Sequence, residues 1–268
     1  MPIVTFTTDF GAGDGYAGAM KGVVLSMAPQ AQLVDITHGV PGQDVAAGAV
    51  ALAQAAPLFP PGTIHIAVVD PGVGGERADI LIEAGGSLFV GPDNGVLSLA
   101  ARPPRRIYRI ETSSFRREPV SPTFHGRDVF APTAGRLAAG AQASDAGPTI
   151  DTMVEIGAPP LHKRSGVVEG QVIHIDAFGN LITSLPAELL GAITGASGGG
   201  AGDVAIEVEG TEGKFNPVFG RTFSDVQSGA LIAYIGSGGQ LEIARRDGSA
   251  AKRIGIDRGA TVRVSSGS

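Results

Sequence analysis

Residues 63–74 read Thr63-Ile64-His65-Ile66-Ala67-Val68-Val69-Asp70-Pro71-Gly72-Val73-Gly74. A short, mostly apolar run ends abruptly at an Asp-Pro-Gly turn. Such a run is typical of a strand that is buried on both faces of a parallel sheet. In open sheets of this kind, ligands bind outside the carboxyl ends of the strands, so the residues after Val69 are candidates for a site.

Sequence on either side of this strand alternates between strand-like and helix-like segments. The expected strands are Pro2 to Thr7, Gln32 to Ile36, Thr63 to Val69 and Ile80 to Val90, and the expected helices are Tyr16 to Met27 and Val45 to Ala55. Strands that alternate with crossover helices predict an α/β domain. We expect a mostly parallel sheet sandwiched by helices over residues 1–157.

The pattern changes near residue 166. Short strands follow one another with little helix, apart from an expected turn at Pro186 to Leu190. These strands are Val167 to Ile175, Val204 to Val208, Ala230 to Ile235, Leu241 to Ala244 and Thr261 to Val264. The pattern predicts a small antiparallel β-barrel domain over residues 167–268, joined to the first domain by a linker at residues 158–166.

Composition excludes several classes of protein. The 268 residues carry a net charge of −6 and no cysteine, which excludes disulfides and Cys-ligated metals and gives nucleic acid no general reason to bind. An arginine-rich run at residues 102–117 is interpreted as a solvated surface segment. No apolar stretch reaches the length of a membrane span, and no signal peptide is recognised, so we expect a cytoplasmic protein with no membrane partner.

Polar clusters follow three of the expected strands. They are Thr7 to Gly11, Val69 to Gly74 and Gly91 to Gly95, and the last contains Asp93 and Asn94. Any one of them could be a simple turn, but three at one edge of a sheet indicate a binding site. His125, in Phe124-His125-Gly126-Arg127-Asp128, is either a surface histidine or a proton acceptor. The other four histidines show no metal-ligand spacing, and no phosphate loop or dinucleotide fingerprint is present.

Five motifs occur in an order that resembles the S-adenosyl-L-methionine (SAM) hydroxide adenosyltransferases, which are related to fluorinase and chlorinase. The motifs are Thr8-Asp9-Phe10-Gly11, Asp70-Pro71-Gly72-Val73-Gly74, Gly91-Pro92-Asp93-Asn94-Gly95, Phe124-His125-Gly126-Arg127-Asp128 and Ile175-Asp176-Ala177-Phe178-Gly179-Asn180. The resemblance covers nearly the whole chain. It implies an α/β domain followed by a β-barrel domain, and homotrimers with sites at the interfaces between subunits.

The resemblance also implies which residues handle the attacking water. Asp70, Arg77 and His125 match the Asp-Arg-His set of the hydrolytic members. A sulfonium leaves without help from an acid, so the reaction needs an oxygen nucleophile held in line behind C5′, and no metal or organic cofactor. Either Asp70 or His125 could accept the proton from water, and the sequence leaves that choice open.

Further positions match residues that bind the substrate. Asp9 corresponds to the carboxylate that holds the ribose diol, and Asp176 to the one that holds the methionine ammonium. Phe178 and Asn180 correspond to residues on the adenine side, and Ser237 and Arg245 to those near the methionine carboxylate, which an arginine fork suits. Asp93 and Asn94 are also counted as candidates for substrate binding.

The departures from the halogenases favour hydrolysis. The halogenases have Tyr, and then Ser or Gly, where this chain has His125 and Gly126, and they lack the Asp and Arg of the water-handling set. The expected reaction is therefore hydrolysis of SAM to adenosine and L-methionine. A chlorinase-like halogenase and a non-catalytic protein that binds SAM or adenosine remain as alternatives.

Overall fold

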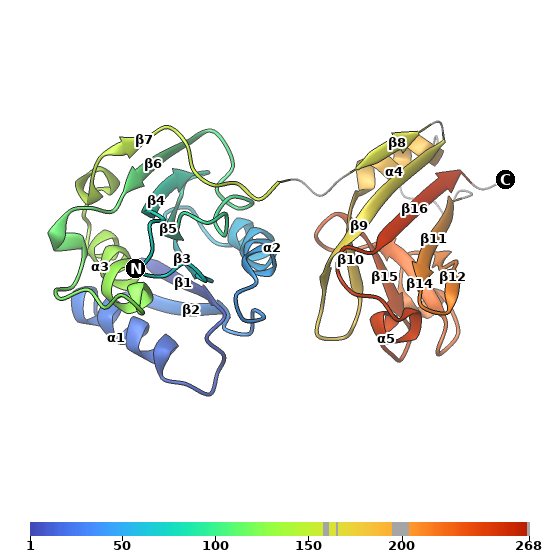
Figure 1. Ribbon diagram of the computed structural model, residues 1–268, viewed down its shortest axis with the longest axis horizontal. Coiled ribbons are helices and arrows are strands. Elements are labelled where there is room, and N and C mark those ends of the chain that lie inside the picture. The colour runs from blue at the N-terminus through green and yellow to red at the C-terminus, as the bar shows by residue number, and fades with distance from the viewer. Residues whose placement is uncertain (158–160, 165, 195–203, 267–268) are drawn as a thin grey trace. The chain divides into compact units, whose positions relative to one another are not determined.

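The computed structural model describes residues 1–157, 161–164, 166–194 and 204–266. The chain forms two compact units, Met1–Ile156 and Gly157–Ser268. Each unit has its own sheet (Figure 1). Two clusters of buried side chains form the core of the first unit, and one cluster forms the core of the second. The division between the units lies beside residue 157.

The N-terminal unit is built on a seven-stranded sheet with the order β2-β1-β3-β5-β4-β6-β7. Its strands are β1 (Ile3–Thr8), β2 (Gln32–Thr37), β3 (Ile64–Val68), β4 (Asp79–Ala84), β5 (Ser87–Pro92), β6 (Arg105–Arg109) and β7 (Thr149–Ile150). The neighbouring strands from β2 to β5 are parallel. The pairs β5–β4, β4–β6 and β6–β7 are antiparallel. The expectation of a mostly parallel sheet is therefore wrong in this respect, because half of the sheet is antiparallel.

A tight hairpin explains the difference. The segment Ile80 to Val90, expected to be one strand, is two antiparallel strands joined at Gly85 and Gly86. Both glycines have positive φ, 57° and 79°. A two-residue turn with positive φ at both positions matches the twist of a hairpin, and Gly-Gly is one of its sequence signals. The hairpin turns β4 back beside β5 and adds the antiparallel half of the sheet.

Helices cover both faces of this sheet (Figure 1). Helices α1 (Tyr16–Met27) and α2 (Val45–Ala55) confirm the expected bounds, and α3 (Ala131–Ala138) is additional. Side chains of β3 alternate between two cores, as the period of two in a strand requires. Ile64 and Ile66 pack on the α1 and α3 side, whereas Ala67 packs on the α2 side. Shorter helical segments are η1 (Ala56–Leu58), η2 (Ser113–Phe115), η3 (Gly126–Phe130) and η4 (Ala143–Ala146).

The C-terminal unit is a curled sheet with the strand order β12-β11-β16-β9-β10-β15-β14-β13, to which β8 adds beside β9. Its strands are β8 (His162–Arg164), β9 (Val167–Ile175), β10 (Leu181–Pro186), β11 (Val204–Gly210), β12 (Gly213–Phe215), β13 (Val218–Phe219), β14 (Leu231–Ile235), β15 (Gln240–Arg245) and β16 (Thr261–Ser266). All pairs are antiparallel except β13–β14. The expected strand-rich antiparallel character is confirmed, but the order runs open from β12 to β13 over the described residues, as a half-barrel.

Helical segments of the C-terminal unit are α4 (Ala187–Thr194), η5 (Phe223–Asp225) and α5 (Ala250–Ile254). The expected turn at Pro186 to Leu190 is the start of α4. In the stretch expected to be a linker, His162–Arg164 forms β8 and pairs with β9, while residues 158–160 and 165 lie outside the described residues. Within the described part of the chain, no helix is long and apolar enough to cross a membrane.

Candidate active site

The parallel strands β1, β3 and β5 end at one edge of the N-terminal sheet, and the site lies there. Asp9 follows β1 and Asp70 follows β3. The loop after Asp70 carries Arg77 back toward that edge. Gly74 in this loop has φ of 74°, and a Cβ there would lie 2.2 Å from the carbonyl oxygen of Pro122. Glycine at this position therefore lets the loop pack against the segment that leads to His125.

His125 precedes a π-helical turn, Gly126–Phe130, which continues into α3. Turns of this type often occur at functional sites. Gly126 is closely packed, because an added Cβ would lie 3.0 Å from Met20 Sδ and 3.3 Å from the ring of Phe124. The backbone around His125 is thus fixed by close packing.

Arg77 joins the residues that the sequence singled out. Its Nε donates to Asp70 Oδ1 at 2.9 Å, and its Nη2 donates to Asp70 Oδ2. The same Nη2 lies 3.1 Å from His125 Nδ1. The structure therefore brings Asp70, Arg77 and His125 together, with a bidentate pair between arginine and carboxylate that fixes both groups.

A fourth member of this cluster, Asp79, is absent from the set predicted from sequence. It is the first residue of β4. Asp79 Oδ1 lies 3.0 Å from His125 Nδ1 and also accepts from Arg77 Nη1, while Oδ2 accepts from Arg116 Nη2 at 3.1 Å. The only sequence signal for it was a charged residue two positions after Arg77, at the start of an apolar strand.

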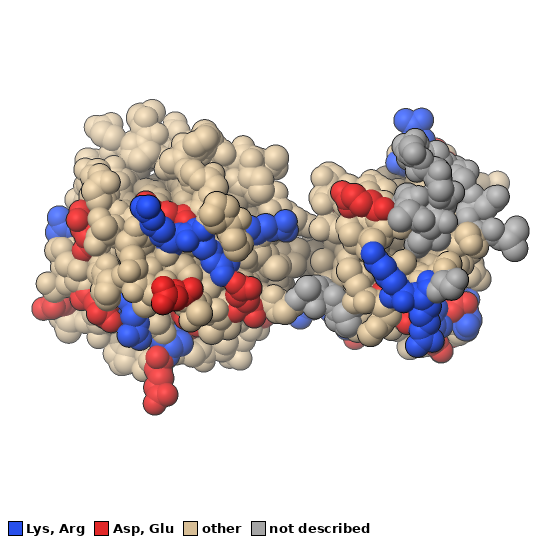
Figure 2. Space-filling model, turned by 90° about the horizontal axis from the view of Figure 1, so that it is seen from above, with Lys and Arg blue, Asp and Glu red and all other residues tan. Residues whose placement is uncertain are grey.

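Arg116 also corrects the interpretation of the arginine-rich run as a solvated surface segment. Its side chain is 28% exposed and donates to Asp79 and to the carbonyl of Ile110. Elsewhere, acidic and basic side chains are interspersed on the visible face of each unit (Figure 2). The run is therefore partly structural, and one of its members belongs to the site.

The cluster is largely buried, so its charges must be paired. The side chains of Asp70, Asp79 and His125 are only 5%, 6% and 13% exposed. Two carboxylates, Asp70 and Asp79, face two guanidinium groups, Arg77 and Arg116, so the charges balance when the imidazole is neutral. Burial lowers the pKa of Arg77, but the hydrogen bonds and charges of Asp70 and Asp79 outweigh this effect and raise the pKa overall.

A cavity of about 590 Å³ opens beside the cluster. It is lined by Asp9, Phe10, Tyr16, Gln43, Val68, Asp70, Pro71, Val73, Ser121, Thr123, Phe124, His125, Gly126 and Arg127. The rings of Phe10, Tyr16 and Phe124 contact one another at centroid distances of 5.2 to 5.9 Å. The cavity thus combines an apolar wall with the carboxylates of Asp9 and Asp70 and the imidazole of His125, as ligand sites commonly do.

Asp9 is held by strained backbone. Its Oδ2 accepts from the backbone N–H of Gln43 at 2.8 Å. Gln43 has φ of 65°, a conformation that costs about 1–3 kcal/mol for a residue other than glycine. Such strain clusters at binding sites, which agrees with the place of both residues in the cavity wall.

Asp93 and Asn94 serve the fold instead of lining this cavity. Asp93 Oδ1 accepts from the backbone N–H of Val154 at 2.7 Å. Asn94 Nδ2 donates to the carbonyl of Val69 at 2.8 Å, and its Oδ1 accepts from the backbone of Val96. Both side chains tie the end of β5 to neighbouring segments.

The remaining candidates lie in the C-terminal unit. Phe178, Asn180 and Arg245 line a cavity of about 730 Å³ together with Thr222, Phe223, Ser224, Arg246, Asp247 and Gly248. Phe178 is 79% exposed. Asp176 accepts from the backbone N–H groups of Phe178 and Asn180 and from Asn180 Nδ2, so it shapes the turn between β9 and β10. Ser237 lies exposed in the turn between β14 and β15 and does not line this cavity.

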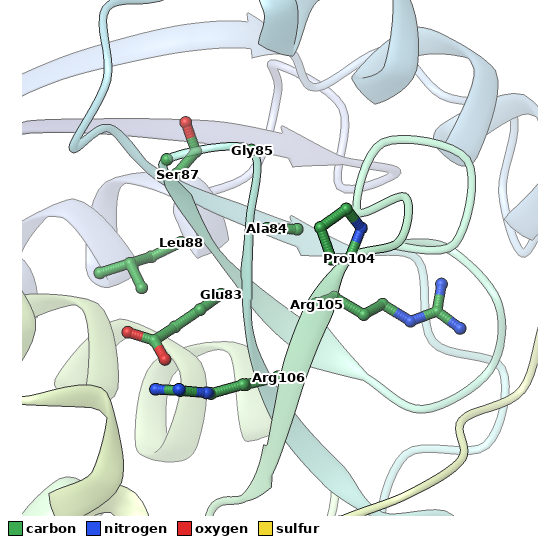
Figure 3. A pocket seen from close by; sticks show the side chains of 9 residues that line it. Glu83, Ala84, Gly85, Ser87, Leu88, Pro104, Arg105 and Arg106 are labelled. Carbon is green, nitrogen blue, oxygen red and sulfur yellow. The ribbon is translucent and has the colours of Figure 1, made fainter.

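A third hollow, of about 620 Å³, lies at the opposite edge of the N-terminal sheet (Figure 3). Its lining comes from the β4–β5 hairpin and the start of β6, and includes Glu83 and Arg106. None of the residues predicted to form the site lies there. Among the described residues, no group of three or more His, Cys, Asp or Glu side chains is placed to hold a metal ion.

Fold and site together define a two-unit α/β protein with a buried network of carboxylates, arginine and imidazole beside a cavity. Comparison with protein families identifies it further. The model for the SAM hydroxide adenosyltransferase N-terminal domain matches residues 4–147, and the model for the C-terminal domain of the same family matches residues 170–263. The chain belongs to the SAM hydroxide adenosyltransferase family, which confirms the resemblance carried by the motifs.

Individual relatives agree with this assignment. An (R)-S-adenosyl-L-methionine hydrolase of Salinispora tropica is 38% identical over 271 residues, covering 99% of this chain and 98% of the relative. One of Thermus thermophilus is 39% identical, covering 97% and 98%. A fluorinase of Actinoplanes is 28% identical, covering 98% and 97%. The crystal structure of an uncharacterized conserved protein from Thermotoga maritima has a TM-score of 0.88 at 30% identity and covers 99% of this chain and 100% of that one.

Proposed function

We propose that this protein hydrolyses (R)-S-adenosyl-L-methionine to adenosine and L-methionine. The observation that carries the proposal is the cluster of Asp70, Arg77 and His125 beside the cavity of the N-terminal unit. Relatives of similar length at 37–39% identity are named as hydrolases of this substrate, whereas the fluorinases are 26–28% identical. The relatives' names specify the (R) configuration, which the sequence motifs do not address.

The reaction is a displacement at C5′ of the nucleoside. The oxygen of water bonds to C5′, the C5′–S bond breaks, and its electron pair goes to sulfur, which leaves as the neutral thioether of methionine. One proton of the water passes to a side chain of the cluster. Positioning of the nucleophile in line with the leaving group can supply about 7–11 kcal/mol of the barrier. The sulfonium loses its charge in this step, so a site with little water favours the reaction.

The test is product analysis with purified protein and each sulfonium epimer. Hydrolysis predicts equal amounts of adenosine and methionine from the (R) epimer, at a rate that is independent of chloride. A 5′-chloro nucleoside that forms only with chloride would show a halogenase instead. Tight binding of SAM or adenosine without products would show a binding protein.

We assign the ribose diol to Asp9 and the nucleoside and methionine ends to Asp176, Phe178, Asn180, Ser237 and Arg245, as the family resemblance implies. Asp9 lies in the cavity of the first unit, and Phe178, Asn180 and Arg245 line a separate cavity of the second unit. Asp93 and Asn94 stay weaker candidates, because their side chains hold turns.

A homotrimer is part of the proposal, with each site formed by the N-terminal unit of one subunit and the C-terminal unit of its neighbour. Its test is complementation between two inactive variants, Asp70→Asn and Arg245→Ala. Mixed subunits would regain part of the activity, because some sites would combine an intact first unit with an intact second unit. Mixtures without any recovery after subunit exchange would contradict a shared site.

The proposed reaction needs neither a metal nor an organic cofactor, because the sulfonium is itself the leaving group. Dialysis against a chelator is therefore expected to leave turnover unchanged, and restoration by an added metal after a loss would contradict this. A cytoplasmic location stays a prediction of composition alone.

A further inference from the structure

His125 Nδ1 has two neighbours that make incompatible demands on it. Asp79 Oδ1 lies 3.0 Å away and can only accept a hydrogen bond, whereas Arg77 Nη2 lies 3.1 Å away and can only donate one. A proton on Nδ1 satisfies Asp79 but points toward an arginine N–H. A lone pair on Nδ1 satisfies Arg77 but faces a carboxylate oxygen. The position of one proton therefore decides how the imidazole works.

The surroundings favour the proton on Nδ1. Arg77 is already occupied by Asp70, through Nε and Nη2, and by the carbonyl of Ala78 and Asp79, through Nη1. It therefore does not depend on His125 for a partner. Asp79 is a buried carboxylate, for which a hydrogen bond from the imidazole is charge-assisted. The alternative would direct the imidazole lone pair at that carboxylate in surroundings with little water to screen the repulsion.

This arrangement determines what the other ring nitrogen can do. In a neutral imidazole, one nitrogen carries the proton and the other the lone pair. Within the described part of the chain, all hydrogen bonds of the His125 ring are at Nδ1, and the ring lines the cavity. Nε2 is consequently the nitrogen available to a molecule in the cavity, and with Nδ1 protonated it presents a lone pair.

We propose that Asp79 is a positioning residue that holds His125 with its proton on Nδ1, so that Nε2 is the base that takes the proton of the attacking water. The proposal rests on the hydrolase function proposed above and deepens it by choosing between Asp70 and His125. In the step, one O–H bond of water breaks and an Nε2–H bond forms, while the Nδ1–H bond to Asp79 stays in place. The imidazolium that forms is then stabilised by the carboxylate of Asp79.

Asp70 has a different part in this scheme. Both of its oxygens accept from Arg77, so the pair holds the guanidinium beside Nδ1. Other charged groups that face the imidazole cluster are Asp79 and Arg116, which are paired with each other. Asp70, Arg77 and Arg116 thus fix the carboxylate and the ring, and the proton moves only at His125.

The direct test is the tautomer of His125 in the unmodified protein, measured from imidazole nitrogen chemical shifts of ¹⁵N-histidine-labelled protein at a pH of about 8, where free imidazole is neutral. The resonances of His125, among the five histidines, are assigned from their loss in His125→Gln. A protonated Nδ1 with an unprotonated Nε2 is the expected result. A protonated Nε2, alone or with Nδ1, would overturn the proposal. This readout does not depend on substrate, so it is separate from any failure of the hydrolase function.

A pair of variants provides the kinetic test. Asp79→Asn is expected to lower kcat by roughly 10²–10⁴-fold, the usual contribution of a general base, and to leave KM within about twofold. It should also shift the tautomer of His125, and Asp79→Glu should restore part of kcat. The matched control is Glu83→Gln, which changes the carboxylate near the other end of β4 (Figure 3). Glu83 accepts a hydrogen bond from the hydroxyl of Tyr108 and lies outside the Asp79 cluster. An Asp79→Asn protein with unchanged kcat and tautomer would overturn the role of Asp79.

Discussion

Asp70 in the N-terminal unit and Asp176 in the C-terminal unit both follow a strand, yet their oxygens are used differently. Asp70 accepts twice from Arg77, which in turn contacts His125, 48 positions further along the chain. Within the described ranges, Asp176 accepts hydrogen bonds from its own turn, that is, from the backbone of Phe178 and from both the backbone and side chain of Asn180. The first carboxylate holds a buried network together, whereas the second shapes a turn that leaves Phe178 exposed.

We expect the network around Asp70 to serve the chemistry of the proposed reaction and the turn around Asp176 to serve recognition of the substrate. Fixed, buried and charge-paired groups can hold a nucleophile and a base with the precision that a displacement requires. An exposed aromatic on a tight turn offers contact area to a ligand but no proton transfer. We therefore expect variants of the first unit to change kcat and stability, and variants of the Phe178 turn to change KM.

The largest effect is expected from His125→Ala. Loss of the base should lower kcat by roughly 10²–10⁴-fold while the affinity for SAM changes little, because the imidazole acts on water. Steady-state kinetics together with calorimetric titration of SAM measures both quantities. His162→Ala, an exposed residue of β8, is the control. Equal losses of affinity and kcat would place His125 in substrate binding instead.

The ion pairs of the two units are compared by the free energy of unfolding of two variants, Arg77→Met and Arg263→Met. Removing one partner of a buried charge network costs about 3–5 kcal/mol, because Asp70 and Asp79 lose their main cation. The matched change, Arg263→Met, removes a 43% exposed arginine that pairs with Glu169 and Glu207, where solvent screens the ion pairs and their loss should change the free energy of unfolding much less. Urea unfolding of both variants gives the free energies. Similar values for the two would contradict the contrast between the units.

Acid should lower the free energy of unfolding of the N-terminal unit through His65, a buried residue outside the Asp70 network. Burial lowers the pKa of His65 from its ordinary value of 6.5 to about 4. Between these values the unfolded chain binds a proton that the folded chain does not, so stability is complete above pH 6.5 and declines as pH falls toward 4. The loss is about 2 kcal/mol by pH 5. Urea unfolding from pH 7 to 5 tests this, and His65→Gln should show a shallower dependence on pH. Equal slopes would remove His65 as the cause.

The smallest effect is expected from Phe178→Ala. Loss of an aromatic contact of about 0.5–1.5 kcal/mol corresponds to a rise in KM of roughly 2- to 13-fold, with kcat retained. Since the ring is 79% exposed, the free energy of unfolding should change by less than about 0.5 kcal/mol. Kinetics and urea unfolding of one preparation measure both. A fall in kcat with an unchanged KM would contradict the role of this turn in recognition.

Much of the fold could be predicted because its signals are local. The apolar runs and helical periods marked α1 and α2 at their observed bounds and placed β1, β2, β3 and β9 within a residue or two. The order of the motifs identified the family, and the positions of Asp70, Arg77 and His125 followed from it. These residues then met in the structure at the edge where parallel strands end.

What could not be predicted depends on contacts between distant segments. One exception is local: Gly85-Gly86 splits one expected strand into a hairpin, and this turn signal lies between two apolar segments that together resemble a single strand. Asp79 looked like the polar start of a strand, and Arg116 like part of a surface run. Only the folded chain brings Arg116, 37 positions away, onto the carboxylate of Asp79. The sequence leaves open whether Asp93 and Asn94 hold a turn or line a site, and in the folded chain both side chains hold turns.

The most direct test of a water-handling network in the N-terminal unit is a single turnover of (R)-S-adenosyl-L-methionine in ¹⁸O-labelled water. Mass spectrometry locates the label in the products. We predict one ¹⁸O in adenosine, at the 5′ oxygen, and none in methionine, with formation slowed in His125→Ala as strongly as kcat. Adenosine without label, or labelled adenosine formed at the same rate by His125→Ala, would contradict the account.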